Sequence, residues 1–142
     1  MHTLTFASTE FPVLPHEDEE LNPGILGRSV ADWIKISLSG TRFAITEDID
    51  EDFGHCLVVY HKPYWLWVGC AGSSDHPYAE GGLDQIVAAA FPLESIKWRI
   101  WVSTEWGLLS RLLGRDQRAR DKKELLDLLK ARLSALPHVS FK

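Results

Sequence analysis

The stretch from Glu51 to Cys70, EDFGHCLVVYHKPYWLWVGC, decides how the chain folds. Residues that favour strands, β-branched and aromatic, fill Leu57–Tyr60 and Tyr64–Val68. Pro63 stands between them, and proline belongs in a connection because it lacks the amide hydrogen that a strand ladder needs. The stretch therefore predicts an acidic turn followed by a β-hairpin.

Side chains alternate between the two faces of a strand, so pairing Tyr60 with Trp65 sorts the hairpin into two faces. The aliphatic face holds Leu57, Val59, Leu66 and Val68, and is flanked by His55 and Cys70. The aromatic face holds Tyr60, Trp65 and Trp67 beside Val58. A sheet that is apolar on both sides is covered on both sides or uses one side for binding. The aromatic face is thus either a binding surface or a second core covered by residues 71–94.

Length and composition are those of one globular domain over residues 1–142, in which residues 1–22 form an irregular or partly extended N-terminal arm. The chain has 142 residues, of which 45% are hydrophobic and 25% charged. We expect a cytoplasmic protein, since no apolar run approaches the roughly 20 residues of a membrane helix and the start lacks a secretory signal. The net charge of -5 disfavours nucleic acid as the partner.

The remaining patterns predict an α+β fold, in which a mostly antiparallel sheet of about four to six strands carries two long helices on one face. Apolar spacing predicts helices over about 24–39, 106–113 and 119–136. Alternation predicts strands over 3–6, 41–46, 95–104 and 139–141. Residues 84–91 fit a buried strand or a short helix, and we favour the strand. The acidic run after Pro15 is interpreted as a solvated arm, with docking on a basic partner as the alternative.

Helices covering the aliphatic face would leave the aromatic face open. Trp101 joins that face from the strand over 95–104, with Arg99 beside it. Tryptophan and tyrosine dominate binding hot spots because they combine a large apolar area with a polar group. The predicted binding residues are Tyr60, Trp65, Trp67, Trp101 and Arg99.

Several motifs resemble those of a loose group of small bacterial proteins. They are Asn22-Pro23-Gly24 with Gly27-Arg28 and Ala31-Asp32-Trp33, then Glu51-Asp52-Phe53-Gly54, and Leu66-Trp67-Val68-Gly69-Cys70. The group has no established activity, so the resemblance implies a shared fold and nothing about function. Phe53-Gly54-His55 stands where a Trp-Gly-Trp pattern is more usual in the group.

Enzymatic signatures are scarce in this sequence. It has no Gly-x-Ser-x-Gly elbow, no His-Glu-x-x-His and no Cys-x-x-Cys. His55 and His61 are six residues apart on one strand, roughly 20 Å at about 3.3 Å per residue, so they cannot share an ion. We expect no metal and no cofactor. The alternative site, for a small metal- or Cys/His-dependent hydrolase, comprises Asp52, His55, Cys70 and His76.

The sequence on its own favours a non-enzymatic module that binds a protein partner or a second copy of itself as a homodimer. The aromatic face would form the interface, and neither nucleic acid nor a membrane is expected as a partner. A toxin-neutralising immunity protein is one class that fits a small acidic chain. An enzyme would instead need Asp52, His55, Cys70 and His76 to converge on a pocket.

Overall fold

The computed structural model describes residues 3–19, 21–105 and 115–142. It has one six-stranded antiparallel sheet with the strand order β2-β3-β4-β5-β1-β6. The strands are β1 (Thr3–Ser8), β2 (Glu47–Glu51), β3 (Gly54–Tyr60), β4 (Trp65–Ser74), β5 (Ile96–Glu105) and β6 (Val139–Phe141). The helices are α1 (Arg28–Leu38), α2 (Gln85–Ala90) and α4 (Arg115–Ser134), with short 3-10 turns η1 (Pro77–Ala79) and η2 (Leu93–Ser95). The α+β prediction is confirmed.

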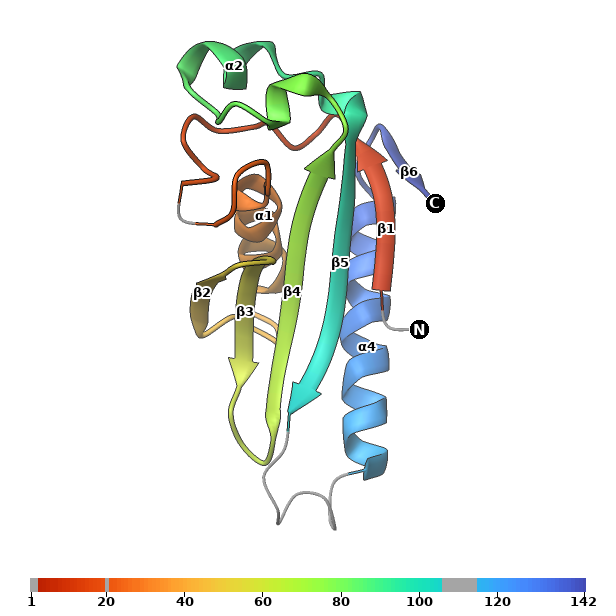
Figure 1. The fold of residues 1–142 in the computed structure, drawn as a ribbon. Coiled ribbons are helices and arrows are strands. Elements are labelled where there is room, and N and C mark those ends of the chain that lie inside the picture. The colour runs from red at the N-terminus through yellow and green to blue at the C-terminus, as the bar shows by residue number, and fades with distance from the viewer. Residues whose placement is uncertain (1–2, 20, 106–114) are drawn as a thin grey trace.

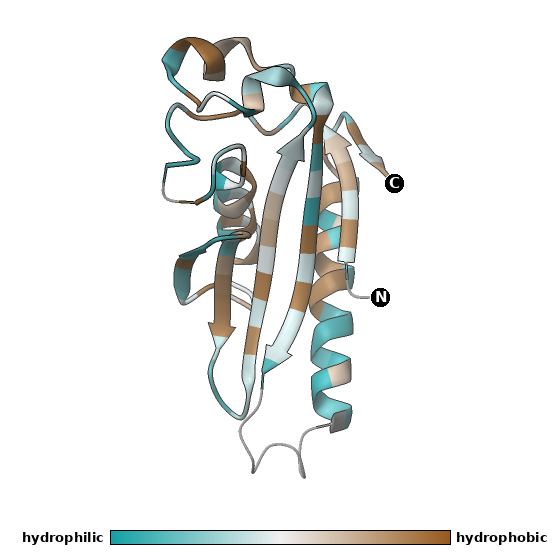
Figure 2. Ribbon diagram, viewed as in Figure 1, coloured by the Kyte–Doolittle hydropathy of each residue, from teal (hydrophilic) through white to brown (hydrophobic). Residues whose placement is uncertain are grey.

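Both long helices cover the same face of the sheet. Helix α1 packs on β3 and β4, α4 packs on β5 and β1, and the two helices touch each other (Figure 1). Hydrophobic and polar bands alternate along β5 (Figure 2). Its apolar members Trp98, Ile100 and Val102 are buried under the helices. The helix side of the sheet therefore forms the main core, as its alternation predicted. No helix among the described residues is long and apolar enough to cross a membrane.

The hairpin pairs largely as predicted. Leu57 lies opposite Val68 and Val58 opposite Trp67. The register then shifts between Val58 and Tyr60, where a β-bulge places Tyr60 opposite Leu66 instead of Trp65. A bulge adds one residue to one strand, and every side chain beyond it changes face. Tyr60 therefore leaves the aromatic face and packs against the main core.

Two segments differ from the predicted strands. Residues 41–43 turn the chain after α1, where the Thr41 hydroxyl donates to the Leu38 carbonyl and accepts from the Phe43 amide, and residues 44–46 are irregular. The strand is instead the acidic segment Glu47–Glu51, at the edge of the sheet. Edge strands commonly carry charge, which opposes pairing with another chain. Alternation at 41–46 was misleading because the Thr41 side chain hydrogen-bonds to nearby backbone groups and so favours a turn.

The segment 84–91 is a helix and not the strand that we favoured. The Asp84 side chain accepts from the Val87 amide and so caps the first turn of α2. Ala88 is buried whereas Ile86 is 79% exposed, so only one side of the apolar run meets the core. Residues 75–95 lie at one end of the sheet, beyond the tip of β4 (Figure 1). They do not cover the aromatic face.

Helix α1 begins later than predicted. Leu26 exchanges two backbone hydrogen bonds with Gly72, so the chain is still extended there. The Glu17 carboxylate then accepts from the amides of Gly27 and Arg28, both at 2.9 Å, and caps the helix. Asp18 is buried and accepts from the Gly24 amide. Part of the acidic run is thus structural, contrary to the prediction of a solvated arm.

The predicted strands at 3–6, 95–104 and 139–141 are confirmed by β1, β5 and β6. The C-terminal helix starts earlier than the predicted 119, at Arg115, and buries the expected stripe of Leu125, Leu129 and Leu133. The short helix predicted over 106–113 lies outside the described residues.

Candidate functional site

The open face of the sheet carries an aromatic cluster, defined here as Phe53, Trp65, Trp67 and Trp101. Phe53 comes from the β2–β3 turn, and its ring centroid lies 6.1 Å from that of Trp67 and 5.5 Å from that of Trp101. Trp67 and Trp101 are 6.4 Å apart and meet edge to face, a favoured arrangement of aromatic rings. Trp65 is 41% exposed, Phe53 likewise, and the other two are half-buried. The described residues leave this cluster accessible from one side.

The cluster is positioned by a glycine in the neighbouring strand. Gly69 lies directly opposite Trp101 in the β4–β5 register. A Cβ atom on Gly69 would lie 2.2 to 2.5 Å from atoms of the Trp101 indole, so the ring lies flat on the bare backbone. This is aromatic covering of a strand glycine, which restores packing that the glycine lacks.

Gly69→Ala should therefore displace Trp101 from the sheet. The indole is half-buried at the surface and can swing outward, so we expect a loss of about 1–3 kcal/mol from the free energy of unfolding. The near-ultraviolet circular dichroism of the tryptophans should change as well. Gly81→Ala is the matched control, because a Cβ there meets nothing within 4 Å. An unchanged tryptophan spectrum in Gly69→Ala would contradict this contact.

A hollow of about 160 Å³ opens beside the cluster. Its lining residues are Ile49, Glu51, Phe53, Cys56, Trp65, Trp67 and Glu105. Burial, followed by the charges of Glu51, Glu105 and nearby acids of β2, raises the pKa of the Cys56 thiol to about 11. The thiol therefore stays protonated at neutral pH and is a poor nucleophile. The same carboxylates give an aromatic hollow a negative potential.

Other predicted binding residues lie apart from this hollow. Arg99 is exposed on the open face of β5, where it lies opposite Thr5 and Ala71. It precedes Trp101 by two residues and so lies farther from the hollow, which includes Glu105 at the other end of β5. Tyr60 is on the helix side, where its hydroxyl hydrogen-bonds to Tyr64 and to Asp121 of α4. The aromatic surface thus retains Trp65, Trp67 and Trp101 and gains Phe53, which the sequence had placed only in a turn.

Tyr60 belongs to a largely buried polar cluster with Tyr64 and Asp121, which the exposed Arg42 joins from the surface. Both tyrosine hydroxyls donate to Asp121 Oδ2, and Arg42 donates to Oδ1 at 3.0 Å. Burial and the hydrogen bond to Asp121 raise the pKa of Tyr64 to about 12 and that of Tyr60 further. Burial alone would raise the pKa of Asp121, but the donors outweigh it and the pKa is lowered. The cluster joins α4 to the β3–β4 hairpin and is structural.

The alternative enzymatic site does not assemble. Cys70 lies opposite His55 on the helix side, but it is fully buried and its thiol pKa is raised by that burial. Asp52 is exposed in the β2–β3 turn. His76 caps η1 from the preceding position, where its Nδ1 accepts from the Tyr78 amide. Among the described residues these four side chains form no group of metal-ligating distance.

A different set of ligand atoms gathers around His55. Its Nδ1 lies 2.9 Å from Asp50 Oδ1 and 3.6 Å from Asp48 Oδ1. Asp48 Oδ2 accepts from Arg28 at 2.6 Å and from Lys35 at 2.8 Å. Burial opposes the Asp48 charge, but these two cations outweigh it and lower the pKa of the carboxyl. Sequence reasoning missed Asp48 because 47–52 was interpreted as a turn; i, i+2 spacing on a strand would have revealed it.

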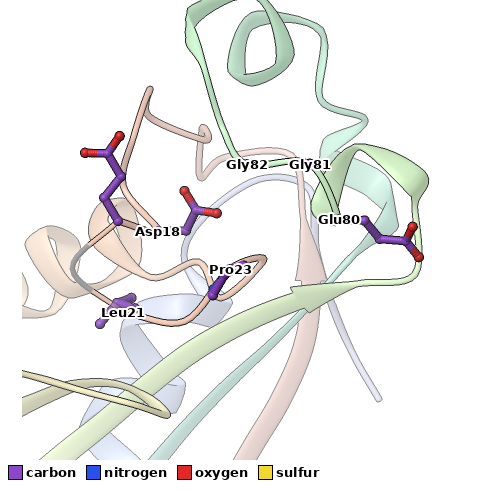
Figure 3. Close-up of a pocket in the computed structure, with 7 residues that line it drawn as sticks. Asp18, Leu21, Pro23, Glu80, Gly81 and Gly82 are labelled. Carbon is purple, nitrogen blue, oxygen red and sulfur yellow. The ribbon is translucent and has the colours of Figure 1, made fainter.

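A second hollow, of about 350 Å³, lies elsewhere, between the N-terminal loop and residues 80–82 (Figure 3). Asp18 and Glu80 lie on opposite sides of it, and the Glu80 carboxylate points away from Asp18 (Figure 3). Asp18 already accepts from the Gly24 amide. The described lining of this hollow contains none of the predicted site residues.

No family model, curated protein or solved structure matches this chain. The function must therefore be argued from the chemistry of the aromatic cluster, its acidic hollow and the ligand set around His55.

Proposed function

We propose that this protein is a non-enzymatic binding module whose aromatic hollow receives a lysine or arginine side chain from a partner protein. The observation that carries the proposal is the pairing of aromatic rings with carboxylates around one opening. Phe53, Trp65 and Trp67 supply the rings, and Glu51 and Glu105 supply the charges. A cation over the face of tryptophan is attracted by the ring quadrupole, and a nearby carboxylate adds direct charge attraction.

The magnitudes favour a protein partner over a small free cation. A cation–π contact contributes about 0.5–2 kcal/mol, which alone gives only weak binding. The exposed apolar area of the aromatic cluster adds the hydrophobic contribution that interface hot spots draw from tryptophan. The net charge of -5 also speeds association with a basic surface. An immunity-type protein that blocks a basic toxin is one class with this chemistry.

Substitutions in the hollow should weaken binding to an arginine-containing peptide. The probe is a nine-residue peptide with one central arginine, paired with the same peptide carrying citrulline, which keeps the shape and removes the charge. Trp65→Ala and Glu105→Gln should each weaken arginine-peptide binding about 3–30-fold. Both residues are exposed, so folding should be retained. Binding is measured by tryptophan fluorescence and by the indole N–H signals in nuclear magnetic resonance spectra.

Asp127→Asn is the control, since Asp127 is exposed on α4 and pairs with Lys123. It should bind the arginine peptide like the wild type. Equal binding of the citrulline and arginine peptides would overturn the cationic occupant. Sedimentation provides a second arm: a wild-type dimer that Trp65→Ala and Trp101→Ala convert to monomer would make a second copy the occupant and overturn the proposal.

A further inference from the structure

Three potential metal ligands meet where β2 and β3 pair. Asp50 lies directly opposite His55, and Asp48 lies two residues before Asp50 in β2, on the same face. One ligand atom from each of these residues lies within 4.8 Å of the others. The set lies on the helix side of the sheet, beside the start of α1, and so is separate from the aromatic hollow on the open face.

His55 is buried with its two ring nitrogens incompletely satisfied. Its side chain is 4% exposed, Nε2 has no hydrogen-bond partner among the described residues, and Nδ1 approaches Asp50 Oδ1 at 2.9 Å without hydrogen-bond geometry. Nε2 faces Gly27, where a Cβ atom would lie 3.3 Å away, so the backbone of Gly27 packs against the ring. Nδ1 faces the two carboxylates. Unsatisfied buried polar atoms are rare in proteins and call for an explanation, which a bound ion can provide.

We propose that Asp48, Asp50 and His55 bind a divalent transition-metal ion of the Zn²⁺ class. Two ligand atoms that are each about 2.1 Å from one ion lie about 3.0–3.4 Å apart at ordinary coordination angles. The distances of 2.9 and 3.6 Å from Nδ1 to the two carboxylates bracket that range. Imidazole suits zinc and its neighbours, while an all-oxygen set would favour Mg²⁺ or Ca²⁺.

The surroundings orient one ligand and leave a route for the ion. Arg28 and Lys35 hold Asp48 through Oδ2, so Oδ1 is directed toward His55. Outer hydrogen bonds of this kind fix the orientation of metal-ligating carboxylates. The Asp48 and Asp50 side chains are 20% and 31% exposed, so water and an ion can reach the set. Three protein ligands leave coordination positions for water.

The charges nearby permit a cation. Asp32 also pairs with both Arg28 and Lys35, so three aspartates face two basic side chains. The three carboxylates and the two basic side chains together carry one negative charge in excess. A divalent ion would therefore enter a site of opposite sign.

The test is a calorimetric titration. The purified full chain is first treated with a chelator and is then titrated with zinc chloride. We expect one zinc ion per chain and a shift of the His55 Nδ1 signal in ¹⁵N spectra, with Nε2 little changed. Asp50→Asn and Asp48→Asn keep the side-chain shape and should each weaken zinc binding at least tenfold. Asp52→Asn removes a neighbouring carboxylate outside the set and should bind zinc like the wild type.

Two results would overturn the site. One is the absence of binding heat and of a His55 shift at millimolar zinc. The other is unchanged binding in both Asp48→Asn and Asp50→Asn, which would place zinc elsewhere on the chain. Peptide binding at the aromatic hollow is measured without metal, so failure of either proposal leaves the other standing.

Discussion

Replacing Trp98 with alanine should lower the free energy of unfolding by about 3–5 kcal/mol, the usual cost of truncating a core tryptophan. Trp98 is fully buried, and its ring meets Phe11 edge to face at 6.0 Å. It also covers Gly72, directly opposite in β4, where a Cβ atom would lie 2.5 Å from the indole. Urea unfolding followed by circular dichroism measures the loss.

Two further variants separate volume from hydrogen bonding at this position. The Trp98 Nε1 has no hydrogen-bond partner among the described residues, so Trp98→Phe removes an unsatisfied donor and should cost clearly less than alanine. Gly72→Ala should destabilise strongly, because a buried indole cannot swing aside as Trp101 can. Trp65→Ala, at a position 41% exposed, is the surface control. A Trp98→Ala loss no larger than that of Trp65→Ala would contradict the packing described here.

Replacing Asp121 with alanine should cost about 2–4 kcal/mol, since two tyrosine hydroxyls would lose their acceptor. Tyr64 is 1% exposed, so water cannot readily replace the carboxylate there. Asp127→Ala, on the exposed side of the same helix, should leave the unfolding midpoint unchanged. The comparison isolates the buried cluster from any general effect of removing an acid from α4. Equal midpoints for the two variants would show that the cluster contributes nothing.

The same cluster predicts how stability depends on pH. The pKa of Asp121 is lowered in the folded protein, so the unfolded chain binds more protons at acidic pH. Its stabilisation is complete above the unfolded pKa of about 4 and is lost as pH falls through the lower folded value. The stability difference between wild type and Asp121→Asn should therefore shrink below pH 4. Urea unfolding from pH 7 to pH 3 measures this difference.

The sequence was most informative where apolar residues recur at the spacing of a single strand or helix. Alternation over Trp98, Ile100 and Val102 correctly predicted a half-buried strand, and the leucine spacing of α4 correctly predicted its buried stripe. It was least informative where the start of a helix depends on a hydrogen bond from a backbone amide to a carboxylate side chain. Asp84 caps α2 and Glu17 caps α1, and neither effect shows in apolar periodicity.

The candidate site shows the same division. Trp65, Trp67 and Trp101 were placed on one face from alternation alone, and the β4–β5 register agrees. Tyr60 was assigned to the wrong face because one bulge reverses the face of all residues beyond it in the strand. No turn motif in the sequence indicates that bulge. Phe53, in the β2–β3 turn, and Glu105, at the end of β5, both line the hollow. Their meeting depends on pairing between strands that are far apart in sequence.

The sequence by itself determined the fold class, the central hairpin and the aromatic character of one sheet face. These follow from local patterns, because alternation and apolar spacing act between residues a few positions apart. Only the tertiary structure decided that Tyr60 belongs to the core, that Glu51 and Glu105 flank the rings, and that Asp48 and Asp50 face His55. Those arrangements depend on register and on burial, which no single segment encodes because each requires a second strand as its partner.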